Sequence, residues 1–129
     1  MPRPASSTPT EGELEILQVL WEHGPSTVRQ IFDTLKDQRG TGYSTTLKMV
    51  QVMTEKGLVC REEAGRPQVY RPAQSQEQTQ LELVDRLIQR GFGGSAVSMV
   101  LRAASAKRIS SKDLAQIKRM IDKAKGGVS

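Results

Sequence analysis

The sequence has almost none of the residues that build disulfides and metal sites. It contains one cysteine, Cys60, and one histidine, His23, among 129 residues. A single cysteine cannot form an intramolecular disulfide, and one Cys with one His cannot supply the four ligands of a structural zinc site. These shortages exclude a disulfide scaffold and a zinc module, and they favour a reducing compartment, the cytoplasm.

Long apolar runs are missing as well. The longest uncharged, mainly apolar stretch covers residues 91–101, whereas a membrane span needs roughly 20 residues. Residues 1–9 hold three prolines, three Ser or Thr residues and no apolar core, so we expect a disordered arm there rather than a secretory signal. We therefore expect no insertion into a membrane.

Catalytic motifs are also absent. The chain has no G-x-x-x-x-G-K-[ST] phosphate loop, no H-E-x-x-H zinc motif and no G-x-S-x-G nucleophile elbow. His23 and Cys60 fall on different predicted elements, and nothing selects a pair of carboxylates for acid–base chemistry. We therefore expect no enzyme activity, no cofactor and no metal.

Positive charge is in excess but unevenly distributed. The net charge is +5, which permits nucleic-acid binding without demanding it. Residues 1–38 carry three basic and six acidic groups, whereas residues 39–72 carry six and three. Residues 73–129 carry ten and five. The first half is therefore polarised, with its positive end in the middle of the chain.

Residues 10–37 show the pattern of two amphipathic helices. Thr10 and Glu13 fit a capping box, so the first helix is predicted to begin there and to end near residue 22, before a glycine and a proline. Ser26 or Thr27 caps the second helix, which continues to about residue 37. Its apolar residues recur at i, i+3, i+4 and i+7, which gives one buried face.

Residues 44–56 predict a third helix with two different faces, ending before a glycine. Its buried side would consist of Thr46, Met49, Val50 and Met53. The opposite side shows Ser44, Thr45, Lys48, Gln51 and Val52. Short hydroxyl side chains near a helix N-terminus can approach phosphates, and Lys and Gln are long donors that can address guanine and adenine edges.

After the third helix the spacing of apolar residues changes from the helical period to the alternation that is typical of strands. Residues 58–62 and 68–71 predict two short strands joined by a turn at residues 63–67. Three helices followed by a hairpin is the order of a winged helix-turn-helix, whose third helix can lie in the DNA major groove. Arg66 at the hairpin tip is well placed for a backbone or minor-groove contact.

The remainder of the chain predicts three further helices, over about residues 76–90, 95–104 and 111–125, each with an apolar seam. The seams consist of Leu81, Val84, Leu87, Ile88, Val97, Val100, Leu101, Leu114, Ile117 and Ile121. Only 4% of the chain is aromatic, which leaves little bulk for a core. Association of two copies is one way for a small domain to bury more surface.

Three segments carry a family likeness: ELEILQVLWEHGPSTVRQIFDTL, YSTTLKMVQVMTEKGLV and GRPQVYRPA. Through them the chain resembles the penicillinase-repressor family (BlaI/MecI/CopY type) over about residues 10–124. The resemblance implies a mainly α fold with a small β-hairpin, in which residues 10–73 form a winged-helix DNA-binding domain and residues 74–129 a helical dimerisation domain. Such repressors are homodimers that bind inverted-repeat operators on double-stranded DNA.

On matching positions, the resemblance makes residues 44–56 the reading helix and residues 62–69 the wing. The expected DNA contacts are Tyr43, Ser44, Thr45, Lys48, Gln51 and Arg66. For Tyr43, both packing and a phosphate contact stay open. The apolar seams of the last three helices become the homodimer interface.

The chain departs from the family pattern in two ways. In antibiotic-sensing members a sensor protease cuts an Asn-Phe bond, which makes a membrane sensor-protease system a candidate partner. The corresponding place here is Met99-Val100, and the chain contains no asparagine. The copper-sensing branch carries a C-terminal cysteine motif, which is missing here. The inducing signal therefore stays unassigned.

Two other functions stay open on the sequence. A winged-helix domain can serve as a protein-interaction module without DNA activity. Alternatively, Cys60 could make the chain a redox-responsive regulator, which requires an exposed and reactive thiol.

Overall fold

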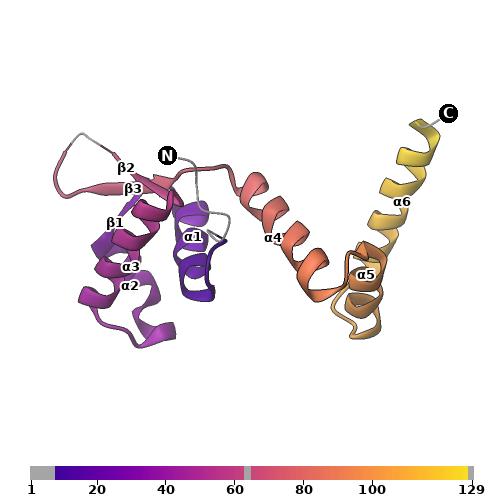
Figure 1. Cartoon of the computed structure of the whole chain (residues 1–129), viewed down its shortest axis with the longest axis horizontal. Coiled ribbons are helices and arrows are strands. Elements are labelled where there is room, and N and C mark those ends of the chain that lie inside the picture. The colour runs from indigo at the N-terminus through magenta and orange to yellow at the C-terminus, as the bar shows by residue number, and fades with distance from the viewer. Residues whose placement is uncertain (1–7, 63–64, 128–129) are drawn as a thin grey trace. The chain divides into compact units, whose positions relative to one another are not determined.

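The computed structural model describes residues 8–62 and 65–127, within which the chain forms six helices and three short strands (Figure 1). In chain order these are α1 (Glu11–His23), β1 (Ser26–Thr27), α2 (Val28–Arg39), α3 (Tyr43–Lys56), β2 (Val59–Arg61), β3 (Val69–Pro72), α4 (Gln76–Gly91), α5 (Ala96–Ser105) and α6 (Ser111–Gly127). The chain divides into two compact units, an N-terminal unit up to Leu83 and a C-terminal unit from Val84. Residues 1–7 of the expected arm and residues 63–64 of the expected turn lie outside the described residues.

Helix α1 begins with the predicted capping box. The Glu13 backbone N–H donates to Thr10 Oγ1 at 3.2 Å, and the Thr10 N–H donates to Glu13 Oε1 at 3.0 Å. The helix ends at His23, and Gly24 follows with a φ of 81°, in the left-handed region that glycine adopts without strain. Local sequence therefore determines both ends of α1.

The residues just before α2 form a strand that the sequence did not predict. In β1, Ser26 lies opposite Tyr70 and Thr27 opposite Val69, in an antiparallel pairing with β3. A strand of two residues is too short to show an alternating pattern, so only the helix cap was visible. Thr27 is that cap, through a second capping box with Gln30.

The three strands form one antiparallel sheet in the order β1-β3-β2. In the predicted hairpin, the half-buried Cys60 of β2 lies opposite Arg71 of β3. The addition of β1 on the other side of β3 gives the hairpin a third strand. The predicted fold class, mainly helical with a small β element arranged as a winged helix-turn-helix, is confirmed.

The core of the N-terminal unit lies among α1, α2, α3 and the sheet (Figure 1). Ile31 of α2 and Met53 of α3 are completely buried, with 0% of their surface exposed. The other buried apolar side chains are Ile16, Leu17, Val19, Leu20, Val28, Leu35, Val50, Leu58, Val59 and Tyr70. On α3 the predicted stripe therefore faces inward, with Thr46 buried and Met49 half-buried.

An ion pair joins the start of α1 to the end of α3. Lys56 Nζ lies 2.8 Å from Glu13 Oε1 and 3.0 Å from Glu13 Oε2, and the Glu13 side chain is only 6% exposed. Burial raises the pKa of Glu13, but hydrogen bonds from Lys56 and Thr10 outweigh burial and leave the pKa below its usual value. One carboxylate therefore caps α1 and holds α3 against it.

The described residues of the C-terminal unit form well-defined helices without a buried core. Ser95 caps α5 by accepting a hydrogen bond from the Ser98 N–H at 3.0 Å. Over residues 84–126, no described residue is buried in the single chain. None of the described helices is long and apolar enough to cross a membrane.

Lys56→Met is expected to lower the free energy of unfolding by about 1–3 kcal/mol, because Glu13 would stay buried without its cationic partner. Urea denaturation near neutral pH measures this change. Lys36→Met is the control, since Lys36 and Asp33 form an exposed pair at 3.9 Å that contributes roughly 0.5 kcal/mol or less. Equal losses in the two variants would contradict a special role of the buried pair.

The same ion pair predicts a dependence of stability on pH. Because folding lowers the pKa of Glu13, the carboxylate stabilises the fold above the pKa of the unfolded chain. This stabilisation is lost as the pH falls through the lowered folded value. Lys56→Met removes the main donor, so its free energy of unfolding should fall less steeply on acidification. Parallel losses in variant and wild type, measured by urea midpoints through the acid range, would contradict this account.

Helix α3 begins without a side-chain cap among the described residues, because Gly42 occupies the N-cap position. Gly42→Ser should raise the free energy of unfolding by about 0.5–1 kcal/mol, since serine supplies a cap oxygen and restricts the unfolded chain. Gly40→Ser is the matched control. The φ of Gly40 is 69°, so serine there is strained and should cost about 1 kcal/mol. Thermal unfolding tests both variants, and a destabilised Gly42→Ser would refute the cap argument.

Candidate nucleic-acid interface

The outer face of α3 is polar. The exposed residues of this helix are Tyr43, Ser44, Thr45, Lys48, Gln51, Thr54 and Glu55. Because Val50 and Met53 anchor the opposite side in the core, the polar face is directed outward. Hydroxyl side chains occupy its first turn, and the long donors Lys48 and Gln51 occupy its middle.

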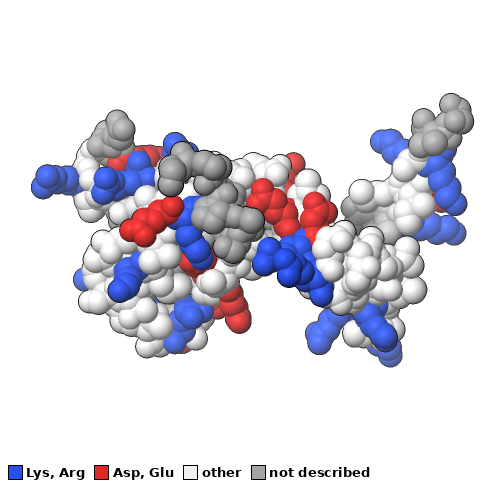
Figure 2. Space-filling view, viewed as in Figure 1, with Lys and Arg blue, Asp and Glu red and all other residues white. Residues whose placement is uncertain are grey.

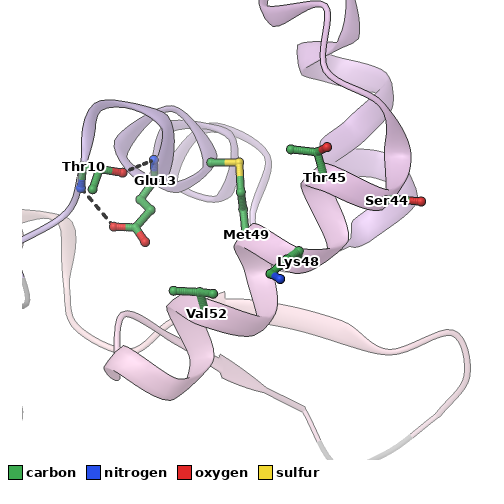
Figure 3. A pocket seen from close by; sticks show the side chains of 7 residues that line it. All are labelled: Thr10, Glu13, Ser44, Thr45, Lys48, Met49 and Val52. Carbon is green, nitrogen blue, oxygen red and sulfur yellow. Dashed lines mark hydrogen bonds between the residues drawn. The ribbon is translucent and has the colours of Figure 1, made fainter.

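A groove of about 430 Å³ lies between α3 and the start of α1 (Figure 3). Its lining consists of Thr10, Glu13, Ser44, Thr45, Lys48, Met49 and Val52. Figure 3 shows the Met49 side chain reaching from α3 toward α1. Gly12 permits this close approach, since a Cβ at its position would lie 2.8 Å from Met49 Cε. Three of the predicted DNA contacts, Ser44, Thr45 and Lys48, therefore share one concave surface.

The acidic residue of this groove is not a free negative charge. The Glu13 carboxylate accepts hydrogen bonds from the Lys56 ammonium and from the Thr10 N–H. Its lowered pKa keeps it ionised, and its partners compensate the charge. An anion that enters the groove would therefore meet Lys48 and hydroxyl groups rather than an unpaired carboxylate.

Tyr43 contacts α2 through an aromatic cluster. Its ring lies edge-on to that of Phe32, with the ring centroids 5.8 Å apart and an interplanar angle of 78°. The guanidinium carbon of Arg29 lies 5.1 Å from the Tyr43 centroid and 5.7 Å from the Phe32 centroid, within the range of cation–π interactions. The structure thus shows packing contacts for Tyr43, and its phosphate contact stays a prediction.

Arg29 is not among the residues that the sequence predicts to contact DNA. The cluster joins α2 to α3 across the loop at residues 40–42, so no single periodic pattern includes all of its members. The spacing of Arg29 and Phe32 could have predicted their contact, because residues at i and i+3 are neighbours on a helix surface. A tyrosine at the start of the next helix completes the cluster only once the helices are packed.

Most Lys and Arg side chains of the first three helices form ion pairs with carboxylates. Helices α1, α2 and α3 contain five Lys or Arg residues. Three of them form the ion pairs Lys36–Asp33, Arg39–Glu15 and Lys56–Glu13. Within residues 8–62 and 65–127, Arg29 and Lys48 pair with no carboxylate. The uncompensated positive charge of the three helices therefore lies at these two residues.

The hairpin adds further basic residues to the N-terminal unit. Figure 2 shows Lys and Arg side chains gathered over the hairpin. A second groove, of about 330 Å³, lies between α3 and the sheet and is lined by Gln51, Thr54, Glu55, Arg61 and Tyr70. Arg66 is exposed in the turn before β3. It lines neither this groove nor the one beside α1, and its contact with DNA stays a prediction.

The apolar side chains predicted to form a dimer are mostly exposed in the single chain. The exposed members are Leu81, Val84, Leu87, Val97, Val100, Leu101, Leu114 and Ile121. Ile88 and Ile117 are half-buried. Met120 is 64% exposed and belongs to the same group, although the sequence prediction omitted it. Its position three residues after Ile117 could have placed it in the apolar seam of α6, because residues at this spacing lie on one side of a helix.

The described residues offer no metal centre. Within them, no group of three or more His, Cys, Asp or Glu side chains could hold a metal ion. His23 lies at the exposed end of α1, with its Nε2 4.0 Å from Glu22 Oε2. The half-buried Cys60 lies on a different element, in β2.

Comparison with known proteins identifies the family. The sequence model of the penicillinase repressor family matches residues 9–123, whereas no curated protein sequence matches the chain. Among solved structures, the solution structure of monomeric BlaI from Bacillus licheniformis in complex with the blaP half-operator is similar at 21% identity. That alignment covers 59% of this chain and 87% of the other, with a TM-score of 0.45. Because the family match covers most of its length, the chain belongs to the penicillinase repressor family, whose members are DNA-binding regulators and not enzymes.

Proposed function

We propose that the chain is a cytoplasmic, dimeric repressor that binds an inverted-repeat operator through α3 and the wing at residues 62–69. One observation carries the proposal. Helix α3 is anchored by its apolar side, so that Lys48 and Gln51 are exposed on the other. The DNA major groove is about 12 Å wide and admits one helix. A helix with one apolar face and one polar face meets that requirement.

The side chains on this face divide between phosphate and base contacts. Ser44 and Thr45 lie in the first turn of α3, where free N–H groups and the helix dipole favour anions. Lys48 can donate to O6 and N7 of guanine, and Gln51 can make a two-point contact with adenine. Arg66 would reach the backbone or the minor groove from the wing.

The C-terminal unit would supply the interface with a second copy. Over residues 84–126 the single chain buries no described residue, while Val97, Leu101 and Met120 are 68%, 63% and 64% exposed. Burial of apolar surface stabilises by roughly 25 cal/mol per Å², so a second copy that covers these side chains would provide the missing core. A two-fold dimer would present its two α3 helices to half-sites about 34 Å apart, or a multiple of it.

Release from the operator would not follow cleavage of an Asn-Phe bond, because the chain contains no asparagine. The corresponding place, Met99-Val100, lies within α5. Met99 is half-buried there, and Val100 is 42% exposed. A membrane sensor-protease that acts on this chain would have to cut a different peptide bond.

Lys48→Ala and Gln51→Ala are each expected to weaken binding to the preferred operator by about 1–3 kcal/mol and to relax base choice at one position. The reason is that each substitution removes a donor to a base edge. Fluorescence anisotropy titrations measure the change, with an operator selected by the wild type from random duplexes and with single-base variants of that operator.

Lys36→Ala and Gln38→Ala are the matched controls, because both residues are exposed on α2 and outside the polar face of α3. They should leave base choice unchanged. Wild-type affinity should fall steeply with salt, since phosphate contacts release counterions. If Lys48→Ala and Gln51→Ala bind every sequence as the wild type does, α3 is not the reading helix.

Leu101→Glu is expected to convert the dimer into a monomer at roughly micromolar protein concentration, because the substitution places a charge in an apolar interface. Sedimentation equilibrium measures the mass. Gln116→Glu adds the same charge to an exposed polar position of α6 and should preserve the dimer. A monomeric wild type would refute the proposed assembly.

A further inference from the structure

We infer that Arg29, in the first turn of α2, is a DNA phosphate contact whose side chain is positioned by Phe32 and Tyr43. The inference rests on the proposed function of α3 and extends it to the preceding helix. It assigns a DNA-binding residue outside α3 and the wing.

Two aromatic rings hold the Arg29 guanidinium. The guanidinium carbon lies 5.1 Å from the centroid of Tyr43 and 5.7 Å from that of Phe32, and the two rings contact each other edge to face. An attraction to the ring faces orients the guanidinium without occupying its N–H donors. The side chain is therefore ordered while its hydrogen-bonding capacity stays available.

No carboxylate of the described residues neutralises this cation, whereas the other arginine of α2 is engaged. Arg39, in the last turn, forms an ion pair with Glu15 of α1. Arg29 is also exposed, so an anion from outside can reach it. An ordered, unpaired guanidinium suits a phosphate because its fork of N–H groups can make two parallel hydrogen bonds to the phosphate oxygens.

The cluster places Arg29 at the end of α3 that approaches phosphates. Tyr43 is the first residue of α3 and directly precedes Ser44 and Thr45. In helix-turn-helix proteins the first helix of the motif crosses the DNA backbone while the second lies in the groove. Since Arg29 contacts Tyr43, the guanidinium lies where the strand that borders the groove would pass.

The test is the binding of Arg29→Ala to the selected operator and to an unrelated duplex of equal length, over a series of salt concentrations. Affinity should fall on the order of fivefold for both duplexes, and the slope of log affinity against log salt should decrease by about 1. Arg39→Ala removes the same charge from the same helix, but from a paired residue, and should retain the wild-type slope. Because Arg29 is exposed, its variant should melt within about 5 °C of the wild type.

Substitutions of Tyr43 test whether the ring positions Arg29. Tyr43→Phe keeps the ring and removes only the hydroxyl of the predicted phosphate contact, so its effect on affinity should be the same in the wild type and in the Arg29→Ala background. Tyr43→Leu removes the ring as well, and the loss beyond that of Tyr43→Phe should disappear in the Arg29→Ala background. An equal additional loss in both backgrounds would show that the ring acts independently of Arg29 and would overturn its positioning role.

The possible negative results of these binding experiments have different meanings. Wild-type affinity and salt slope in Arg29→Ala would overturn the inference and leave the function of α3 standing. A loss confined to the operator would also overturn it, because a phosphate contact carries no sequence information. A wild-type chain that binds neither duplex would overturn the proposed function together with the inference.

Discussion

The burial of one side of α3 determines what the N-terminal unit presents to solvent. Val50 and Met53 are held in the core together with residues of α1 and α2, so the helix cannot rotate about its axis without exposing them. Full burial of such a side chain contributes about 1.5–3 kcal/mol. Lys48 and Gln51 are therefore directed outward before any partner arrives, and a preorganised surface loses less conformational entropy on binding.

Two acidic residues of α1 serve as internal partners. Glu13 and Glu15 of α1 are engaged by Lys56 and Arg39 from the two helices that follow. These two carboxylates, which would otherwise repel a polyanion, thus tie the three helices together. Exposed charges act over only about 8–10 Å at physiological salt. This local pairing therefore influences the electrostatic potential near α3 more than the net charge of the chain does.

Most elements of the fold were predictable because local signals mark them. A capping box begins α1 and a glycine ends α3, and the helical period separated the inner from the outer face of α3. Strand β1 was not predictable, because its two residues carry no pattern and its partner lies far along the chain. Arg29 was not predictable either, since its contact with Tyr43 exists only when α2 and α3 pack together.

The absence of any buried residue among the described residues 84–126 has a consequence for the life of the protein. In the proposed dimer this segment obtains its interior from a second copy, so that its folding equilibrium depends on the total amount of protein. Its melting temperature then rises with concentration. Scarce chains would spend more time with loosened helices, open to degradation, so that the abundance of the regulator would help to set its own turnover.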